Sequence, residues 1–184
     1  MIVSANILKW GMRLYPPLFF QRIWVKNIHP DFMGADITIY KSLLNINANK
    51  SIFGGTIFSA IDPFYPVLLD QYFQHNGIRR TVAWLKTAQI DYIKPARHQL
   101  RIQVRLDQTI LTEALTHIQY EGKITRTFHT RIFDAQGTLC AVAHNEIYIR
   151  DLDFDFEERD QRPKESSASK ERENLKQISN PNKP

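Results

Sequence analysis

The segment Phe53–Pro66, FGGTIFSAIDPFYP, holds the residues whose types and spacing could do chemistry. Gly54 and Gly55 open an apolar stretch typical of a buried helix. Glycines there bring bare backbone N–H groups to the helix N-terminus, where they can hold a developing oxyanion or polarise a carbonyl. Asp62 follows Gly55 by seven residues, which predicts that both face one side of the helix. A carboxylate in this apolar setting is costly unless it is paired or functional.

Pro63 leaves a second interpretation of Asp62 open. Proline has no N–H to donate to the carbonyl of Ser59, so the helix should kink here, and Pro66 reinforces the break. Asp62 could then be the N-cap of a second helix with Pro63 as its first residue, which both residue types favour. The two roles are compatible, because a kink also re-aims the carboxylate.

Two motifs, in this order, resemble those of a known family. FGGTIFSAID (53–62) resembles the HGGxxFSLAD helix opening of hot-dog-fold thioesterases of the phenylacetyl-CoA type, and QIDYIKPAR (89–97) resembles their I-D-F-L-R-P strand. The DPFY at 62–65 and the aromatic N-terminus are more similar to an uncharacterised branch of that superfamily. The resemblance covers about residues 32–150. It implies an α+β hot-dog fold, in which an antiparallel sheet wraps a long central helix and two subunits place the ligand at their interface.

The resemblance also implies roles for single residues. Asp62 stands at the position of the catalytic carboxylate, acting as general base on water or as nucleophile, and the Gly55 N–H would polarise the thioester carbonyl. Asn47 has the spacing of an asparagine that orients substrate or water, and Gly54 and Phe53 would line the substrate site. Phe53 departs from the family pattern, which has histidine there. We therefore expect hydrolysis of an acyl thioester of CoA or acyl carrier protein, with a non-catalytic acyl- or CoA-binding protein as the alternative.

The net charge of +5 is unevenly distributed, with +7 over residues 1–150 and −2 over residues 151–184. A basic body suits an anionic ligand such as a CoA thioester. Lys86, Lys94 and Arg97 lie near expected strand ends, where they could bind its phosphates, although for each one taken alone we favour ordinary surface charge. We expect a homodimer or higher homo-oligomer. We expect no nucleic-acid partner, because no recognisable nucleic-acid-binding module is present.

The cysteine and histidine content predicts no metal, and the lack of a phosphate loop and of a dinucleotide fingerprint predicts no cofactor. A single cysteine, Cys140, excludes an internal disulfide and a zinc site built on several thiolates, and we expect it to be a buried thiol. The six histidines have no metal-binding spacing, although His129 and His144 could be neighbours across the final hairpin. No apolar run is long enough for a conventional spanning helix, so we expect a cytoplasmic protein.

Hydrophobic periodicity predicts the elements that position these residues. Residues 1–30 form a helical element: Val3, Ile7, Trp10 and Leu14 share one helical face, two prolines follow, and a second short helix runs through Leu18–Trp24. That face could anchor the protein on a membrane surface. We favour packing on its own domain or on a dimer mate, because the polar face is only weakly basic.

Residues 31–150 are expected to form the hot-dog domain. It should contain the helix 53–74, kinked at Pro63, a second helix around 110–118, and strands at 37–40, 82–93, 100–106, 124–132 and 138–149. Residues 151–184 have almost no apolar side chain beyond Phe156, so we expect a disordered charged tail.

Overall fold

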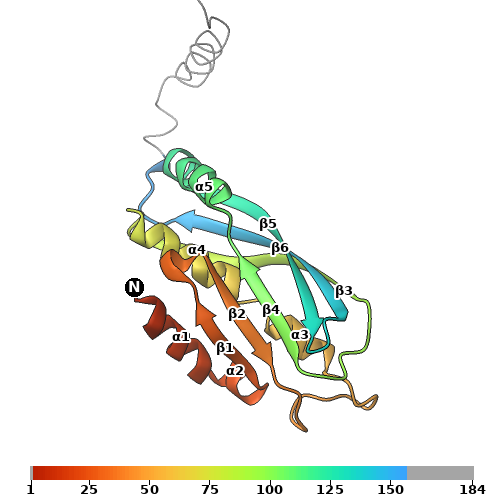
Figure 1. Ribbon diagram of the computed structural model, residues 1–184. Helices are drawn as coiled ribbons and strands as arrows, with labels where there is room; N and C mark the ends of the chain where they lie inside the picture. The colour runs from red at the N-terminus through yellow and green to blue at the C-terminus, as the bar shows by residue number, and fades with distance from the viewer. Residues whose placement is uncertain (1, 157–184) are drawn as a thin grey trace, which may run out of the picture. The chain divides into compact units, whose positions relative to one another are not determined.

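A six-stranded antiparallel sheet is the framework of residues 2–156, which are the residues described in this computed structural model. The strand order is β1-β2-β4-β5-β6-β3 (Figure 1). The elements in chain order are α1 (Ala5–Leu14), α2 (Pro16–Phe20), β1 (Ile23–Ile28), η1 (Pro30–Phe32), β2 (Gly34–Ile39), α3 (Gly54–Ser59), α4 (Phe64–His75), β3 (Thr81–Tyr92), β4 (Leu100–Arg105), α5 (Gln108–Glu121), β5 (Lys123–Asp134) and β6 (Leu139–Asp151).

Buried and exposed side chains alternate along strands of this sheet, as β4 shows. Leu100, Ile102 and Val104 of β4 are buried, while Arg101 and Gln103 between them are exposed. This is the period-two pattern of a sheet with one face on the core. The turn between β5 and β6 is held by Asp134, whose carboxylate accepts backbone N–H groups at 136 and 138. The strand predictions over residues 100–149 are confirmed.

The helix α4 is the buried element that the sheet wraps. Leu68, Leu69 and Phe73 are almost fully enclosed. Near its start, Tyr65 stacks on Phe128 with ring centroids 4.5 Å apart, and its hydroxyl lies 3.0 Å from Thr130 Oγ1. Aromatic stacking and a satisfied hydroxyl fix the first turn of α4 against β5. An antiparallel sheet around a buried helix is the α+β hot-dog fold expected from the sequence.

The predicted helix 53–74 is divided in two rather than kinked. The six-residue helix α3 ends at Ser59, residues 60–63 form a turn, and α4 begins at Phe64. The Asp62 N–H still donates to Phe58 O at 3.1 Å, but Pro63 has no N–H to continue the ladder. The prediction that Gly55 and Asp62 share one face of one helix is therefore wrong, because no continuous helix joins them.

The N-terminal helices differ from the prediction in two ways. The face of α1 that meets the core carries Ala5, Leu8 and Met12, so the apolar stripe predicted to pack is not the packing face. Trp24 lies in β1, not in a second helix, and α2 ends at Phe20. Arg13 anchors α1: its guanidinium donates to Val25 O at 2.7 Å, between the rings of Trp10 and Trp24.

The domain boundaries expected at residues 30 and 150 are not breaks in the fold. β1 begins at Ile23 and pairs with β2, so the sheet starts inside the N-terminal element. β6 extends to Asp151, and Phe154 packs against Gly122. The predicted disordered tail falls mainly on residues 157–184, which lie outside the described residues. No helix within residues 2–156 is long and apolar enough to cross a membrane.

Candidate active site

Asp62 lies in the turn between α3 and α4 with its carboxylate half-buried and unpaired. None of the described residues donates a hydrogen bond to this carboxylate or forms an ion pair with it. The residue is not a helix cap either: Pro63 occupies the N-cap of α4, and no side chain caps that helix. The capping interpretation is therefore wrong. Burial raises the pKa of the Asp62 carboxyl above its ordinary value. An unpaired carboxylate held in this way is a candidate functional group.

Asn145 holds the turn beside Asp62, and the sequence analysis missed it. This fully buried residue of β6 donates from Nδ2 to Ile61 O at 3.2 Å. Its Oδ1 is buried and accepts no hydrogen bond from the described residues. A signal was present in the sequence, because Asn145 is a polar residue at an inward position of an alternating strand. Buried polar atoms without a partner are rare and often mark functional regions.

The two glycines at the start of α3 lie under aromatic rings. The ring of Phe53 covers Gly55, and a β-carbon on Gly54 would lie 3.1 Å from the ring of Tyr92. Tyr92 also donates its hydroxyl to Gly54 O at 3.0 Å. Burial raises the pKa of the Tyr92 phenol, so it stays a donor at neutral pH. The diglycine is thus explained by close approach of rings, and Tyr92 is a second residue that the sequence analysis missed.

The backbone N–H groups of Gly54 and Gly55 have no acceptor among the described residues. The first N–H groups bonded in α3 are those of Thr56 and Ile57, which donate to Phe53 O. Because α3 has only six residues, these free N–H groups, rather than a long helix dipole, would interact with an oxyanion.

Three predicted residues line one surface hollow of about 270 Å³. Asn47, Gly54 and Lys94 meet there with Tyr92 and Ile57. The Oδ1 of Asn47 is already used within its own loop, where it accepts from the N–H groups of residues 49 and 51 and from the hydroxyl of residue 51. Asn47 therefore shapes the loop, and of its side-chain polar atoms only Nδ2 is left to contact a ligand. Asp62 does not line this hollow.

The other predicted cations lie elsewhere. Lys86, in the middle of β3, pairs with Glu146 at 3.3 Å, which reduces its availability for a phosphate. Arg97 is exposed, and its carbonyl accepts from Lys41 Nζ at 3.0 Å. Neither residue lines the hollow that contains Lys94.

His129 and His144 are neighbours, as the sequence suggested. Their Nδ1 atoms are 2.6 Å apart across β5 and β6, so one ring donates and the other accepts. Asp91 Oδ2 lies 3.9 Å from the opposite nitrogen of His144. Within residues 2–156, no cluster of three or more His, Cys, Asp or Glu side chains could hold a metal ion. Cys140 is buried in β6, and burial raises the pKa of its thiol.

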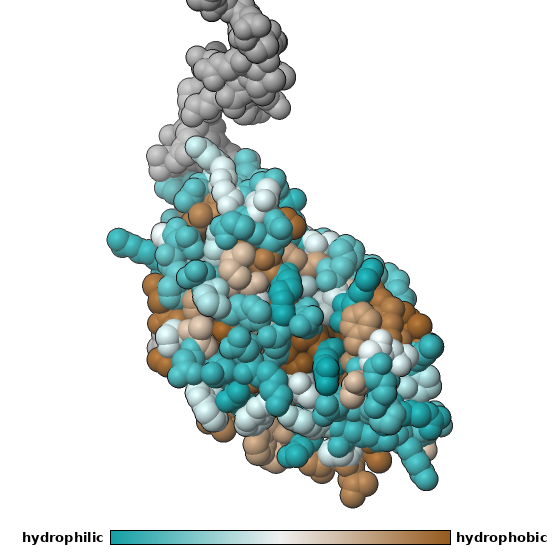
Figure 2. All heavy atoms as spheres, viewed as in Figure 1, coloured by the Kyte–Doolittle hydropathy of each residue, from teal (hydrophilic) through white to brown (hydrophobic). Residues whose placement is uncertain are grey.

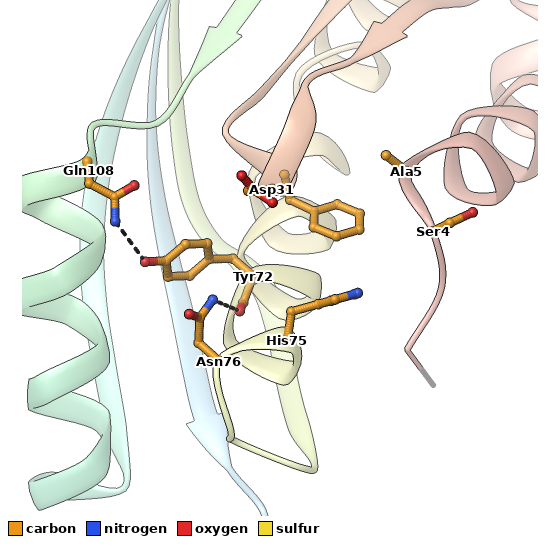
Figure 3. Close-up of a pocket in the computed structure, with 8 residues that line it drawn as sticks. Ser4, Ala5, Asp31, Tyr72, His75, Asn76 and Gln108 are labelled. Carbon is orange, nitrogen blue, oxygen red and sulfur yellow. Dashed lines mark hydrogen bonds between the residues drawn. The ribbon is translucent and has the colours of Figure 1, made fainter.

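A larger hollow, of about 550 Å³, lies between the start of α1, the end of α4 and the start of α5 (Figure 3). None of the predicted site residues lines it. Its polar groups are hydrogen-bonded within the protein: Gln108 of α5 donates to the Tyr72 hydroxyl of α4 at 3.2 Å, and Asn76 donates to Tyr72 O at 2.8 Å at the end of α4. His75 is similarly bonded to Gln71 O through Nδ1. These bonds give the hollow a structural explanation.

Solved structures with the same fold include several named thioesterases. A Pseudomonas aeruginosa protein of unknown function, named a probable thioesterase, has a TM-score of 0.72 and 16% identity, covering 82% of this chain and 97% of that chain. A Haemophilus influenzae thioesterase has a TM-score of 0.61 and 9% identity, covering 85% and 96%. PaaI, from the E. coli phenylacetic acid degradation operon, has a TM-score of 0.55 and 16% identity, covering 79% and 95%. At these identities the likeness establishes the hot-dog fold.

Sequence comparison gives a family without a known activity. Residues 4–149 match the model of a domain of unknown function, DUF4442. No curated protein matches the sequence significantly.

Proposed function

This chain belongs to the DUF4442 family, and we propose that it hydrolyses acyl thioesters with Asp62 as the catalytic carboxylate. The observation that carries the proposal is the unpaired, half-buried Asp62 carboxylate, whose pKa burial raises. It follows a short helix whose first two N–H groups are also free. A base and unused donors on one short segment are what acyl transfer to water requires. The thioesterase names of structural neighbours support the same reaction.

In the proposed reaction, Asp62 removes a proton from water while the water oxygen attacks the thioester carbonyl carbon. The Gly55 N–H donates to the resulting oxyanion. When the intermediate collapses, the carbon–sulfur bond breaks and the thiolate takes the proton from Asp62, which leaves a carboxylic acid and a free thiol. A raised pKa suits this role, because a general base is most effective when its pKa lies nearer the working pH.

The hollow at Asn47, Gly54 and Lys94 is the proposed place for the substrate. Its apolar wall, including Ile57, suits an acyl or aryl group, and Lys94 supplies one cation for the phosphates of CoA or of the phosphopantetheine arm of an acyl carrier protein. Lys86 is not part of this proposal, because it is paired with Glu146.

The test is thiol release from a panel of acyl- and aryl-CoA thioesters. Wild type should turn over at least one of them, and Asp62→Asn should lower kcat about 10²–10⁴-fold. Asp153→Asn, an exposed carboxylate in an ion pair with Arg80, is the matched control and should keep full activity. Equal activity of wild type and Asp62→Asn would exclude Asp62 as the catalyst. One turnover in ¹⁸O-labelled water tests the nucleophilic role, because label in the Asp62 carboxyl requires an acyl–Asp62 anhydride that water opens at the Asp62 carbon.

The alternative is a non-catalytic acyl- or CoA-binding protein. One observation favours it: Asp62 does not line the hollow that contains Gly54. If wild type releases no thiol from any thioester on the panel, yet retains acyl-CoA in equilibrium dialysis, the binding function replaces hydrolysis.

We also propose a homodimer that forms along β3. The two edges of the sheet differ: Arg13 covers β1 by donating to its carbonyls at Val25 and Lys26, whereas β3 pairs only with β6 among the described elements. β3 is a twelve-residue edge strand, and its Trp84 and Tyr92 are exposed apolar side chains. Soluble proteins rarely leave such an edge open. A second copy would bring its own residues to the hollow beside Tyr92.

Sedimentation tests this assembly. The mass of wild type from sedimentation equilibrium should be about twice the 21.6 kDa of one chain. Ala88→Lys, which places a cation in the exposed middle of β3, should give monomers. Gln136→Lys, on the exposed β5–β6 turn, makes the same charge change and should leave the dimer intact. A monomeric wild type would contradict the proposed assembly without bearing on the role of Asp62.

A further inference from the structure

The outward face of α1 is an uncovered apolar stripe. Ile7, Trp10 and Leu14 recur at the spacing of one helical face and are 63%, 48% and 65% exposed. Exposed aromatic rings of α2, at Phe19 and Phe20, continue the apolar surface. Apolar side chains gather along the lower-left margin of Figure 2, where Figure 1 draws α1 and α2. Contiguous exposed apolar surface of this kind marks a docking surface.

The fold does not need this stripe. α1 is held by its opposite face, through Ala5, Leu8 and Met12, and by the Arg13 bonds to β1. Ser4 caps the helix by accepting from the Ile7 N–H at 3.3 Å. Because these contacts already account for the position of α1, the exposed Ile7 and Leu14, and the exposed half of Trp10 beside Arg13, call for another explanation.

The charged residues near the stripe indicate which kind of partner would bind it. Residues 1–30 contain four cations and no Asp or Glu: Lys9, Arg13, Arg22 and Lys26. Arg22 and Lys26 are exposed. A second copy docked through this face would place like charges opposite one another, because a two-fold contact uses the same surface on both chains. An anionic lipid surface would instead attract Lys9, Arg22 and Lys26, at about 1 kcal/mol per Lys or Arg, whereas Arg13 is already held against β1.

We propose that α1 and α2 lie flat on an anionic membrane surface, with Ile7, Trp10 and Leu14 inserted at the level of the headgroups. An amphipathic helix with an apolar face, an aromatic residue and flanking cations binds in this way without crossing the bilayer. Trp and Tyr side chains are enriched at this depth, which suits Trp10 and the exposed Tyr15. This inference does not depend on the proposed hydrolysis.

Vesicle co-sedimentation of the full chain tests the proposal. The probe is phosphatidylcholine vesicles with about 30 mol% phosphatidylglycerol, compared with phosphatidylcholine alone. Wild type should sediment with the anionic vesicles and at least tenfold more weakly with the neutral ones. Raising the salt to about 0.5 M should release it, because exposed charges are then screened.

Variants separate the apolar contribution from the charge contribution. Ile7→Ser/Leu14→Ser should lower the partition coefficient at least tenfold, and Arg22→Gln/Lys26→Gln should lower it on anionic vesicles only. Both pairs are exposed, so thermal melting should stay close to wild type. The matched control is Ile110→Ser/Leu152→Ser, two exposed apolar residues outside the stripe, which should bind like wild type.

Two results would overturn the proposal. One is a wild type that stays in the supernatant with anionic vesicles. The other is an Ile7→Ser/Leu14→Ser variant that binds vesicles as well as wild type does. Suppose that wild type binds no vesicles and that Ile7→Ser/Leu14→Ser has a different sedimentation coefficient from wild type. The stripe is then a contact between copies, and the membrane assignment fails. The rate of thioester hydrolysis in solution should be the same in all these variants. Failure of the membrane proposal would therefore have no bearing on the proposed catalytic role of Asp62.

Discussion

The ring of Phe53 lies against the α-carbon of Gly55, at the first turn of α3. It occupies the space that a β-carbon would need, so the glycine is explained by the aromatic residue two positions before it. The Phe53 side chain is also exposed. The position where the thioesterases have histidine is therefore occupied by an apolar ring next to the proposed oxyanion donor.

Gly55→Ala should separate activity from stability. The Phe53 ring is 57% exposed and can swing into solvent, so the melting temperature should change little or rise, since alanine favours a helix by about 0.5–1 kcal/mol over glycine. The displaced ring and the new methyl group should lower kcat/KM on the order of 10²-fold, the cost of a small misplacement. Phe53→Ala/Gly55→Ala, in which nothing overlaps, should melt no lower than Gly55→Ala. Full activity of Gly55→Ala would contradict the proposed position of the substrate.

Asp62→Asn should make the protein more stable at neutral pH. Burial raises the pKa of Asp62 above its ordinary value of 3.8, so the folded state favours the protonated acid. Its favourable contribution is complete below pH 3.8 and is lost as the pH rises through the folded pKa. Urea unfolding should therefore show a larger free energy for Asp62→Asn at pH 7 and no difference below pH 3.8. A variant less stable than wild type at pH 7 would mean that the carboxylate has a stabilising partner.

Asn145→Asp should destabilise the protein strongly at neutral pH. The side chain is fully buried and its amide donates to Ile61 O, so a carboxylate there would be an unpaired buried charge facing a carbonyl oxygen. We expect a loss of about 3 kcal/mol or more in the free energy of unfolding at pH 7, recovered in part at acid pH as the carboxyl protonates. Asn145→Leu should cost less, about 1 kcal/mol, because it also removes the orphan Oδ1. If the Asp and Leu variants unfold alike at pH 7, the environment of residue 145 is not apolar.

Hydrophobic periodicity predicted the strands β4 to β6 correctly but predicted the wrong packing face for α1. The strands β4 to β6 alternate because one face meets the core, so their pattern has a single explanation. An apolar stripe on a helix has two, a core or a docking surface, and in α1 the packing face of Ala5, Leu8 and Met12 is hardly more apolar than the exposed one. Only the position of Arg13 over β1 settles which face turns inward.

The candidate site was predictable residue by residue but not as an arrangement. Asp62 and the diglycine stand out by type, whereas their relative position depends on Pro63 ending a hydrogen-bond ladder, which divides the helix. Tyr92 and Asn145 act through contacts with residues 38 and 84 positions away in the chain. Such long-range pairs leave only indirect marks, such as a polar residue at an inward strand position.

Asp36 on β2 contacts Arg105 on β4 and His29 after β1, and its loss should make the free energy of unfolding less sensitive to acid pH. Its Oδ1 accepts from Arg105 at 2.6 Å on β4, and its Oδ2 lies 2.9 Å from His29 Nε2. Burial alone would raise the pKa of Asp36, but the hydrogen bonds and charges of these two partners hold it below 3.8. The stabilisation is therefore complete above pH 3.8 and disappears as the pH falls through the lower folded pKa. Because the carboxylate is about a third exposed, Asp36→Asn should lose about 1 kcal/mol or less at pH 7 and nothing in strong acid. Urea unfolding at both pH values measures this, with Asp153→Asn as the control. A loss that persists unchanged in acid would assign the effect to packing rather than to the ion pair.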